Sequence, residues 1–237
     1  MSFNDGDFVR VEYTARRSSD SSLVFTTVEK VAKDENAYSN ETKYGPQLII
    51  LGKHSAIKGV ENAVRGMSVG ESKKATLAPA DAFGERNEQL VSVMRMSEFR
   101  EKDINPYPGM QVNIDGSIAT VKSVNSGRVV VDLNHPLAGE TLLYDIRVTE
   151  KIESDPDKVK ALAEHYSLKP DSVAVNAGVV RVVFGEKVEK NTDYLVNKSA
   201  FAEGILSYMD KAQKVVFEEE YIRKEGKATE KKEEQKA

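Results

Sequence analysis

Alternation of apolar and polar side chains is the feature that most restricts this chain, because it is typical of a strand with one covered face. Val9, Val11 and Tyr13 share one face of an N-terminal segment, and charged side chains stand between them. Residues 71–77 alternate in the same way, and residues 141–150 do so much later in the chain. These segments predict strands that each bury one face against a core.

A separate β-rich block lies between the second and third of these strands. Residues 110–114 and 117–124 flank Asp115-Gly116, a pair that strongly favours a two-residue hairpin turn. A second turn at Asn125-Ser126-Gly127 leads into residues 128–133. The block therefore predicts strands of its own.

Apolar residues with helical spacing occur in the segment that precedes the predicted strand 71–77. Ile57, Val60, Val64 and Met67 recur every three or four residues, which predicts a short helix with one buried face. Residues 28–47 are weakly patterned and predict a long loop with a short helix.

The pattern changes beyond Ser154-Asp155-Pro156, which indicates another domain. Helices are expected over residues 157–166 and 194–209, and strands over residues 172–176, 179–184 and 214–222. This set predicts an independent α+β domain. Residues 225–237 are rich in Lys, Glu and Ala without an apolar face, so they predict a disordered tail.

Composition excludes several kinds of chemistry. The chain of 237 residues is long enough for two or three domains and has no cysteine, so it forms no disulfide and no thiol nucleophile. His54, His135 and His165 are far apart in sequence. The glycines form neither a phosphate-binding loop nor a dinucleotide fingerprint. We therefore expect no cofactor and no metal site.

Charge and hydropathy favour a cytoplasmic protein. The formal net charge is −4, which gives no reason to expect nucleic acid or a membrane as a partner. No apolar run approaches the roughly 20 residues that span a bilayer. The N-terminal residues lack the basic and apolar stretches of a secretory signal, and the absence of cysteine suits a reducing compartment.

Six short motifs follow one another in an order that is informative as a set. They are Val11-Glu12-Tyr13-Thr14, Leu51-Gly52-Lys53, Ala56-Ile57-Lys58-Gly59-Val60-Glu61, Gly66-Met67-Ser68-Val69-Gly70-Glu71, Pro79-Ala80-Asp81-Ala82-Phe83-Gly84 and Thr141-Leu142-Leu143-Tyr144-Asp145. Their order and spacing resemble those of FKBP-type peptidyl-prolyl cis/trans isomerases. The resemblance implies an α+β fold in which an antiparallel sheet wraps around a short helix.

A further motif relates the β-rich block to the same family. Asn134-His135-Pro136-Leu137-Ala138-Gly139 resembles the end of the insert-in-flap domain of SlyD-type FKBPs, and Leu90-Val91 resembles its beginning. In such proteins the insert grips unfolded chains and the isomerase domain acts on their prolines. The C-terminal domain resembles that of the long, archaeal-type members.

The resemblance divides the chain into four parts. They are a discontinuous isomerase domain (1–87 and 137–152), an insert-in-flap chaperone domain (88–136), a C-terminal α+β domain (153–224) and a charged tail (225–237). The implied partners are unfolded or nascent polypeptides that contain proline. For the predicted C-terminal helix 194–209, core packing is the first interpretation, and a homodimer interface is the alternative.

Rotation of an X–Pro bond needs no acid, base or nucleophile. Its barrier of about 18–20 kcal/mol reflects amide resonance. The twisted amide has less charge separation than the planar one, so a dry apolar pocket lowers this barrier. The resemblance assigns six residues to such a pocket: Tyr13, Ala56, Ile57, Val60, Phe83 and Tyr144. It also implies that the backbone N–H of Ile57 donates to the substrate carbonyl.

Three of these positions depart from the usual family residues. Val60 stands where many members have a tryptophan, Phe83 stands at a usual tyrosine, and Tyr144 stands at a usual phenylalanine.

The family also has Phe-Asp ahead of two small hydroxyl residues, and here the segment differs more. In one register Val24 takes the aromatic position and Phe25 that of the carboxylate. In the other register Phe25 is the aromatic residue and Thr26 replaces the carboxylate. Both registers lack the aspartate. The alternative function is therefore a non-catalytic chaperone or binding module with a degenerate pocket.

Two further groups of residues have two interpretations each. A client-binding surface on the insert would comprise Val91, Val93, Met94, Met96 and Phe99. Methionines suit such a surface because they adapt to varied partners. The alternative is that some of these residues form the core of the insert.

His135 could bind a metal, as SlyD-type proteins often do. A hinge-packing role is favoured, because the chain lacks a His/Cys-rich tail.

Overall fold

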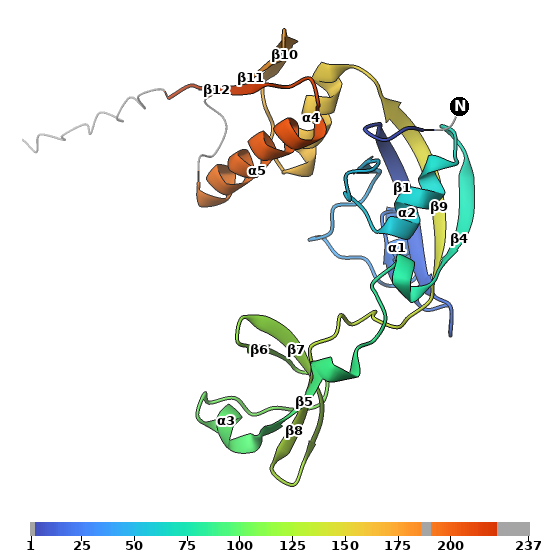
Figure 1. Cartoon of the computed structure of the whole chain (residues 1–237), viewed down its shortest axis with the longest axis vertical. Coiled ribbons are helices and arrows are strands. Elements are labelled where there is room, and N and C mark those ends of the chain that lie inside the picture. The colour runs from blue at the N-terminus through green and yellow to red at the C-terminus, as the bar shows by residue number, and fades with distance from the viewer. Residues whose placement is uncertain (1–2, 186–190, 222–237) are drawn as a thin grey trace, which may run out of the picture. The chain divides into compact units, whose positions relative to one another are not determined.

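The computed structural model describes residues 3–185 and 191–221 (Figure 1). The chain divides into two compact units, the first ending at Lys151 and the second beginning at Ile152. Two of the sheets belong to the first unit and one to the second, and the predicted α+β class is confirmed. Within the described ranges, no helix is long and apolar enough to cross a membrane.

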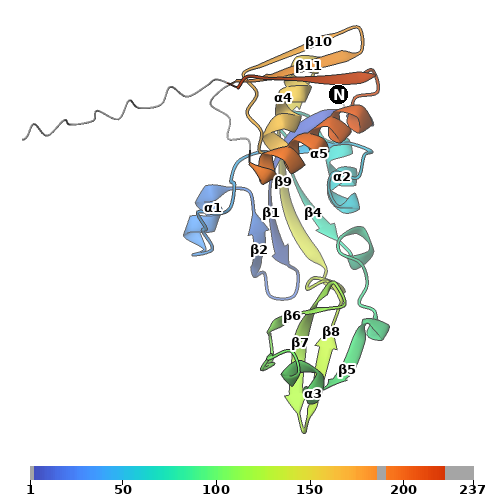
Figure 2. The same cartoon turned by 90° about the vertical axis from the view of Figure 1, so that its left-hand side faces the viewer.

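The first sheet is built from segments that lie far apart in the sequence. Its strands are β1 (Phe8–Arg17), β2 (Leu23–Thr26), β3 (Gln47–Ile50), β4 (Ser72–Leu77) and β9 (Leu142–Ile152). The strand order is β2-β1-β9-β4, and β3 also pairs with β1. The strand that follows the insert therefore completes the sheet between β1 and β4 (Figure 2).

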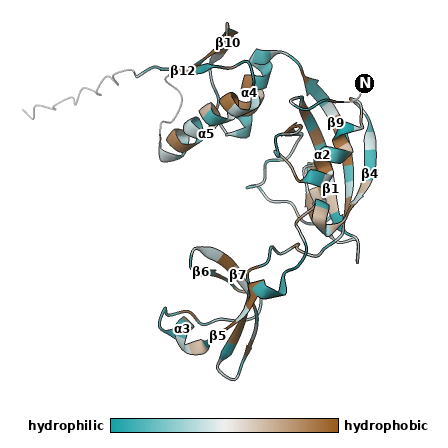
Figure 3. Cartoon of the chain, viewed as in Figure 1, coloured by the Kyte–Doolittle hydropathy of each residue, from teal (hydrophilic) through white to brown (hydrophobic). Residues whose placement is uncertain are grey.

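The predicted alternation accounts for the core of this sheet. Ile146 and Val148 of β9 are buried, as are Val9 and Val11 of β1. Figure 3 shows hydrophobic residues recurring along both strands. Tyr144 of β9 lies opposite Ala75 of β4 in the antiparallel register.

The predicted helix is confirmed as α2 (Lys58–Arg65), which covers this core with Val60, Ala63 and Val64. It approaches the loop after β4 very closely at Gly59. A Cβ atom there would lie 2.7 Å from Leu77 Cδ2 and 2.9 Å from the Asp81 carbonyl oxygen. Only glycine therefore permits this packing.

Two short helical segments flank the same sheet. The predicted loop after β2 contains α1 (Glu29–Asp34), and the loop after β4 begins with the 3₁₀ turn η1 (Pro79–Asp81).

The insert has its own sheet with strand order β5-β8-β7-β6. Its elements are η2 (Glu88–Leu90), β5 (Val91–Arg95), α3 (Met96–Arg100), β6 (Gln111–Ile114), β7 (Ser117–Asn125) and β8 (Arg128–Asp132). The predicted hairpin turn is confirmed, with φ of 50° at Asp115 and 86° at Gly116. The sequence did not predict β5 and α3, because both are too short for periodicity to establish.

The second unit is an α+β unit. Its elements are α4 (Asp155–His165), β10 (Ser172–Asn176), β11 (Val179–Phe184), α5 (Thr192–Tyr208) and β12 (Lys214–Glu219). Helix α4 begins two residues before its predicted start, because Ser154 caps it by accepting the Asp157 N–H and Pro156 suits a first turn. The predicted disordered tail lies outside the described residues.

The predicted C-terminal helix packs one side into the core of this unit. Phe201 and Ile205 of α5 are fully buried, whereas Leu195 is exposed. Core packing therefore accounts for its central apolar residues.

Candidate functional site

Three aromatic side chains from three strands of the first sheet meet in one cluster, which we call the aromatic cluster. Tyr13 comes from β1, Phe25 from β2 and Tyr144 from β9. Their ring centroids are 5.7 Å apart for Tyr13–Phe25, 6.2 Å for Tyr13–Tyr144 and 5.8 Å for Phe25–Tyr144. Edge-to-face and tilted contacts at these distances are favourable arrangements of aromatic rings.

The other predicted pocket residues pack against the same hydrophobic core. Val24, Ala56, Ile57 and Phe83 are half-buried on it, and Val60 is buried within it. Phe25 supplies a ring of the aromatic cluster, whereas Thr26 is buried and its hydroxyl is hydrogen-bonded to that of Thr14. We call the aromatic cluster together with Ile57 and Phe83 the apolar site.

The backbone N–H of Ile57 is a hydrogen-bond donor of the apolar site that has no partner among the described residues. Ile57 immediately precedes α2, and its carbonyl accepts the N–H groups of Val60 and Glu61 at 3.0 and 3.1 Å. Its own N–H donates to none of the residues that the structure describes. This donor is therefore available to a ligand that lies against the apolar side chains.

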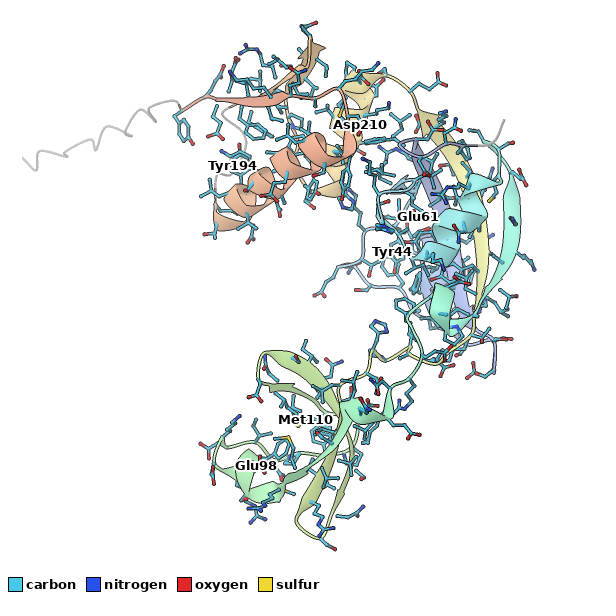
Figure 4. All side chains as sticks on the ribbon, viewed as in Figure 1. Tyr44, Glu61, Glu98, Met110, Tyr194 and Asp210 are labelled. Carbon is cyan, nitrogen blue, oxygen red and sulfur yellow. The ribbon has the colours of Figure 1, made fainter. Side chains whose placement is uncertain are left out.

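A buried carboxylate holds the turn that precedes Ile57. Glu61, labelled on α2 in Figure 4, is 4% exposed. It accepts hydrogen bonds from the Gly52 N–H at 3.1 Å and from the Ala56 N–H at 3.3 Å. The sequence motif contains Glu61, but its role as a support for the turn could not be inferred from spacing.

Two of the three rings of the aromatic cluster, those of Tyr13 and Tyr144, carry a hydroxyl group. Burial raises the pKa of Tyr13, and burial with the neighbouring Tyr13 raises that of Tyr144. Neither hydroxyl has a hydrogen-bond partner among the described residues. No buried side-chain oxygen or nitrogen in that part of the chain lacks a partner, so both hydroxyl oxygens retain accessible surface.

Phe83 is in contact with the segment that leaves the insert. Its ring stacks on His135, a contact that sequence reasoning did not find. This arrangement agrees with the packing role preferred for His135 over metal binding. Across the described ranges, no three His, Asp or Glu side chains are grouped as ligands for one ion.

The two connections of the insert are joined by a polar network centred on two buried residues, Asp132 and Asn134. Asp132 accepts hydrogen bonds from Arg86 and from the backbone and side chain of Asn134, and Asn134 bonds the backbone of Asn87. Burial alone would raise the pKa of Asp132, but these bonds outweigh it and lower the pKa to about 2. The network ties the incoming segment to the outgoing one.

A cavity of about 410 Å³ lies against the other side of the first sheet. Its lining includes Glu12, Thr14, Lys74, Asp145 and Arg147, whose side chains alternate with those of the core. This charged lining differs from the apolar surroundings expected for prolyl isomerisation. Tyr13 is the one predicted pocket residue that contributes to it.

The insert sheet has one covered face and one open face. Val121, Val129 and Val131 form its core with Phe99, which is 4% exposed. The prediction that Phe99 belongs to a client-binding surface is therefore wrong, because α3 folds this ring onto the sheet. Met94 and Met96 are half-buried against the same core.

The open face of the insert carries exposed apolar side chains. Val93 lies opposite Val130 in the register and is 63% exposed. Ile118 of β7 lies on the same face by alternation and is 68% exposed. Val91 is half-buried two residues before Val93. Ile118 was missed, although the alternation of residues 117–124 could have indicated it.

Comparison with known proteins agrees with this architecture. The family model described as "FKBP26, IF domain" matches residues 92–137. A short-type peptidyl-prolyl cis-trans isomerase of Methanocaldococcus jannaschii is 36% identical over 145 residues, which cover 61% of this chain and 91% of that protein.

Two bacterial relatives show the same relationship. An FKBP-type 16 kDa peptidyl-prolyl cis-trans isomerase of Escherichia coli K12 is 32% identical over 139 residues, covering 56% of this chain and 92% of that protein. A SlyD-named FKBP-type isomerase of Pasteurella multocida is 29% identical over 137 residues, covering 56% and 66% of the two chains. The resemblance inferred from the motifs is thereby confirmed. The chain belongs to the FKBP-type peptidyl-prolyl cis/trans isomerase family and is SlyD-like.

Proposed function

We propose that this chain isomerises X–Pro bonds of unfolded polypeptides at the apolar site and holds those polypeptides on the open face of its insert. The observation that carries the catalytic part is the apolar site itself, with three rings in mutual contact and the Ile57 N–H left as a donor. The reaction, cis/trans isomerisation of an X–Pro bond, is inferred from membership of the FKBP-type isomerase family.

The chemistry of the reaction suits such a site. A planar X–Pro amide has strong charge separation, which water stabilises, and the twisted transition state has less. An apolar surface that displaces water therefore favours the transition state over the ground state, as catalysis requires. The Ile57 N–H can hold a substrate carbonyl while the proline ring lies against the aromatic side chains.

The holding part rests on the open face of the insert. Val93 and Ile118 are exposed on one side of a small sheet whose other side is covered. The two residues are on different strands of this face, and exposed apolar surface there suits contact with apolar segments of another chain. The chemistry predicts extended, apolar segments of unfolded chains as ligands, including segments without proline.

A protease-coupled assay with a proline-containing peptide tests the catalytic part. The wild-type chain should accelerate the cis-to-trans step, and Phe83→Ala should lose most of that acceleration because it removes one wall of the apolar site. Val69→Ala is a matched control, since Val69 is an exposed apolar residue outside the apolar site. A wild-type rate equal to the spontaneous rate would leave only the non-catalytic binding function.

Suppression of aggregation of a proline-free client tests the holding part. Val93→Ser combined with Ile118→Ser should weaken suppression and leave isomerisation of a short peptide unchanged. Val69→Ser controls for the loss of any exposed valine. If deletion of residues 88–136 leaves suppression undiminished, the insert is not the holding site.

A further inference from the structure

Tyr144 combines near-complete burial with a hydroxyl that no described residue satisfies. The residue is 2% exposed and lies on β9, between β1 and β4. A phenylalanine would fill almost the same volume without carrying a polar atom into an apolar region. A hydroxyl in such surroundings is unfavourable unless it gains a hydrogen bond.

The accessible surface of this hydroxyl shows where a partner can come from. Every buried side-chain oxygen and nitrogen of the described residues has a partner, so the unpaired Tyr144 oxygen is reachable from outside the core. The rings beside it are those of Tyr13 and Phe25. The reachable space therefore adjoins the aromatic cluster.

We infer that the Tyr144 hydroxyl donates a hydrogen bond to a backbone carbonyl of the bound prolyl peptide and is a substrate-binding residue of the apolar site. This inference rests on the proposed function and deepens it. It assigns a polar contact to a position where the family usually has an apolar ring. It also gives the site a second donor besides the Ile57 N–H.

The ionisation of Tyr144 is consistent with a donor role. Burial, and then the proximity of Tyr13, raises the pKa of the phenol above its ordinary value near 10. The hydroxyl therefore keeps its proton throughout the neutral range. A neutral donor next to apolar rings suits an uncharged acceptor, so the substrate class is an X–Pro segment recognised through its backbone carbonyls.

The experiment compares the wild-type full chain with Tyr144→Phe, using a proline-containing tetrapeptide as the probe. Loss of one neutral hydrogen bond should weaken peptide binding by about three- to tenfold, and kcat/KM should fall by a similar factor. Tyr194→Phe removes a phenol hydroxyl that bonds Glu219 in the second unit, and it should leave both quantities unchanged.

A measurement on the wild-type chain avoids dependence on the variant's folding. With tyrosines labelled at Cζ, the Tyr144 signal should shift when the tetrapeptide is added, and the Tyr194 signal should not. Equal binding and equal kcat/KM for wild type and Tyr144→Phe would overturn the inference and leave the proposed function intact. A Tyr144 signal that does not move at peptide saturation would also overturn it. A wild-type chain that neither binds nor isomerises the peptide would instead refute the proposed catalytic function, and this inference with it.

Discussion

The imidazole of His135 lies parallel to the ring of Phe83, with centroids 4.4 Å apart and an interplanar angle of 3°. The Leu137 N–H donates to His135 Nδ1 at 3.1 Å, which sets the orientation of the imidazole and places the proton of its neutral form on Nε2. His135 belongs to the segment that leaves the insert, whereas Phe83 belongs to the apolar site. The exit of the insert therefore supports one wall of that site.

His135→Ala should lower kcat/KM for a short prolyl peptide by about two- to tenfold, because Phe83 loses a stacked partner worth about 0.5–1.5 kcal/mol. His135→Phe should restore most of the activity, because it keeps a flat ring that can stack on Phe83. The part that is not restored reflects the loss of the Nδ1 acceptor. The protease-coupled assay measures both variants. Equal activity of His135→Ala and wild type would show that Phe83 needs no support from this ring.

Glu61→Ala should destabilise the first unit by about 2–3 kcal/mol, because the Gly52 and Ala56 N–H groups lose a charged acceptor. The turn before Ile57 should loosen, so KM should rise more than kcat falls. Glu61→Gln keeps a carbonyl acceptor and should fall between wild type and Glu61→Ala. Urea unfolding and steady-state kinetics provide the two readouts, and an alanine variant with unchanged KM would contradict the positioning role.

Asp132 should make the connections of the insert sensitive to acid. Its pKa of about 2 lies below the ordinary value of 3.8, so its stabilising contribution is complete above about pH 4 and is lost as the pH falls toward 2. The shift corresponds to about 2 kcal/mol. Asp132→Asn should therefore lower stability near pH 7 and make little difference near pH 2.

Hydrogen exchange can localise this effect. The Leu133 N–H donates to the Leu90 carbonyl beside the network, so its opening free energy should fall in Asp132→Asn at pH 7. The Leu168 N–H in the second unit is an internal control. A difference at Leu133 that is as large at pH 2 as at pH 7 would contradict the assignment to the Asp132 carboxylate.

Gly59→Ala should destabilise the first unit by about 1–3 kcal/mol, because the new methyl group would overlap Leu77 and the Asp81 carbonyl. The loop that carries Phe83 should shift as a result, which lowers activity. Gly66→Ala is the matched control, since a Cβ at that position meets no atom within 4 Å. Thermal unfolding compares the two, and equal melting temperatures would show that α2 can move away from the loop without loss.

Local sequence patterns were sufficient for most individual elements. The alternation of apolar and polar residues over positions 141–150 predicted β9. The helical spacing of apolar residues from Ile57 to Met67 predicted α2. Both patterns arise from neighbouring residues, because a strand or helix repeats its buried positions at a fixed interval. The short elements β5 and α3 were missed, since each spans too few residues for a period to appear.

Side-chain roles within the insert depended on packing. Phe99 belongs to the core because α3 turns it onto the sheet, whereas Val93 stays exposed on the opposite face. Both residues lie in the same apolar stretch of the sequence. The strand register places Val93 on the open face, because adjacent residues of a strand point in opposite directions, and α3 places Phe99 on the covered face.

Sequence patterns were enough to predict the family, most of the secondary-structure elements, the hairpin turn at Asp115-Gly116 and the apolar character of the candidate site. These follow from local periodicity, turn chemistry and ordered motifs. The tertiary structure alone decided that Tyr13, Phe25 and Tyr144 meet, that Glu61 supports the turn before Ile57, and that His135 stacks on Phe83. The ring contacts join strands and loops from different parts of the chain, and the Glu61 contacts depend on the path of the turn before α2. Local periodicity encodes neither sheet order nor loop paths.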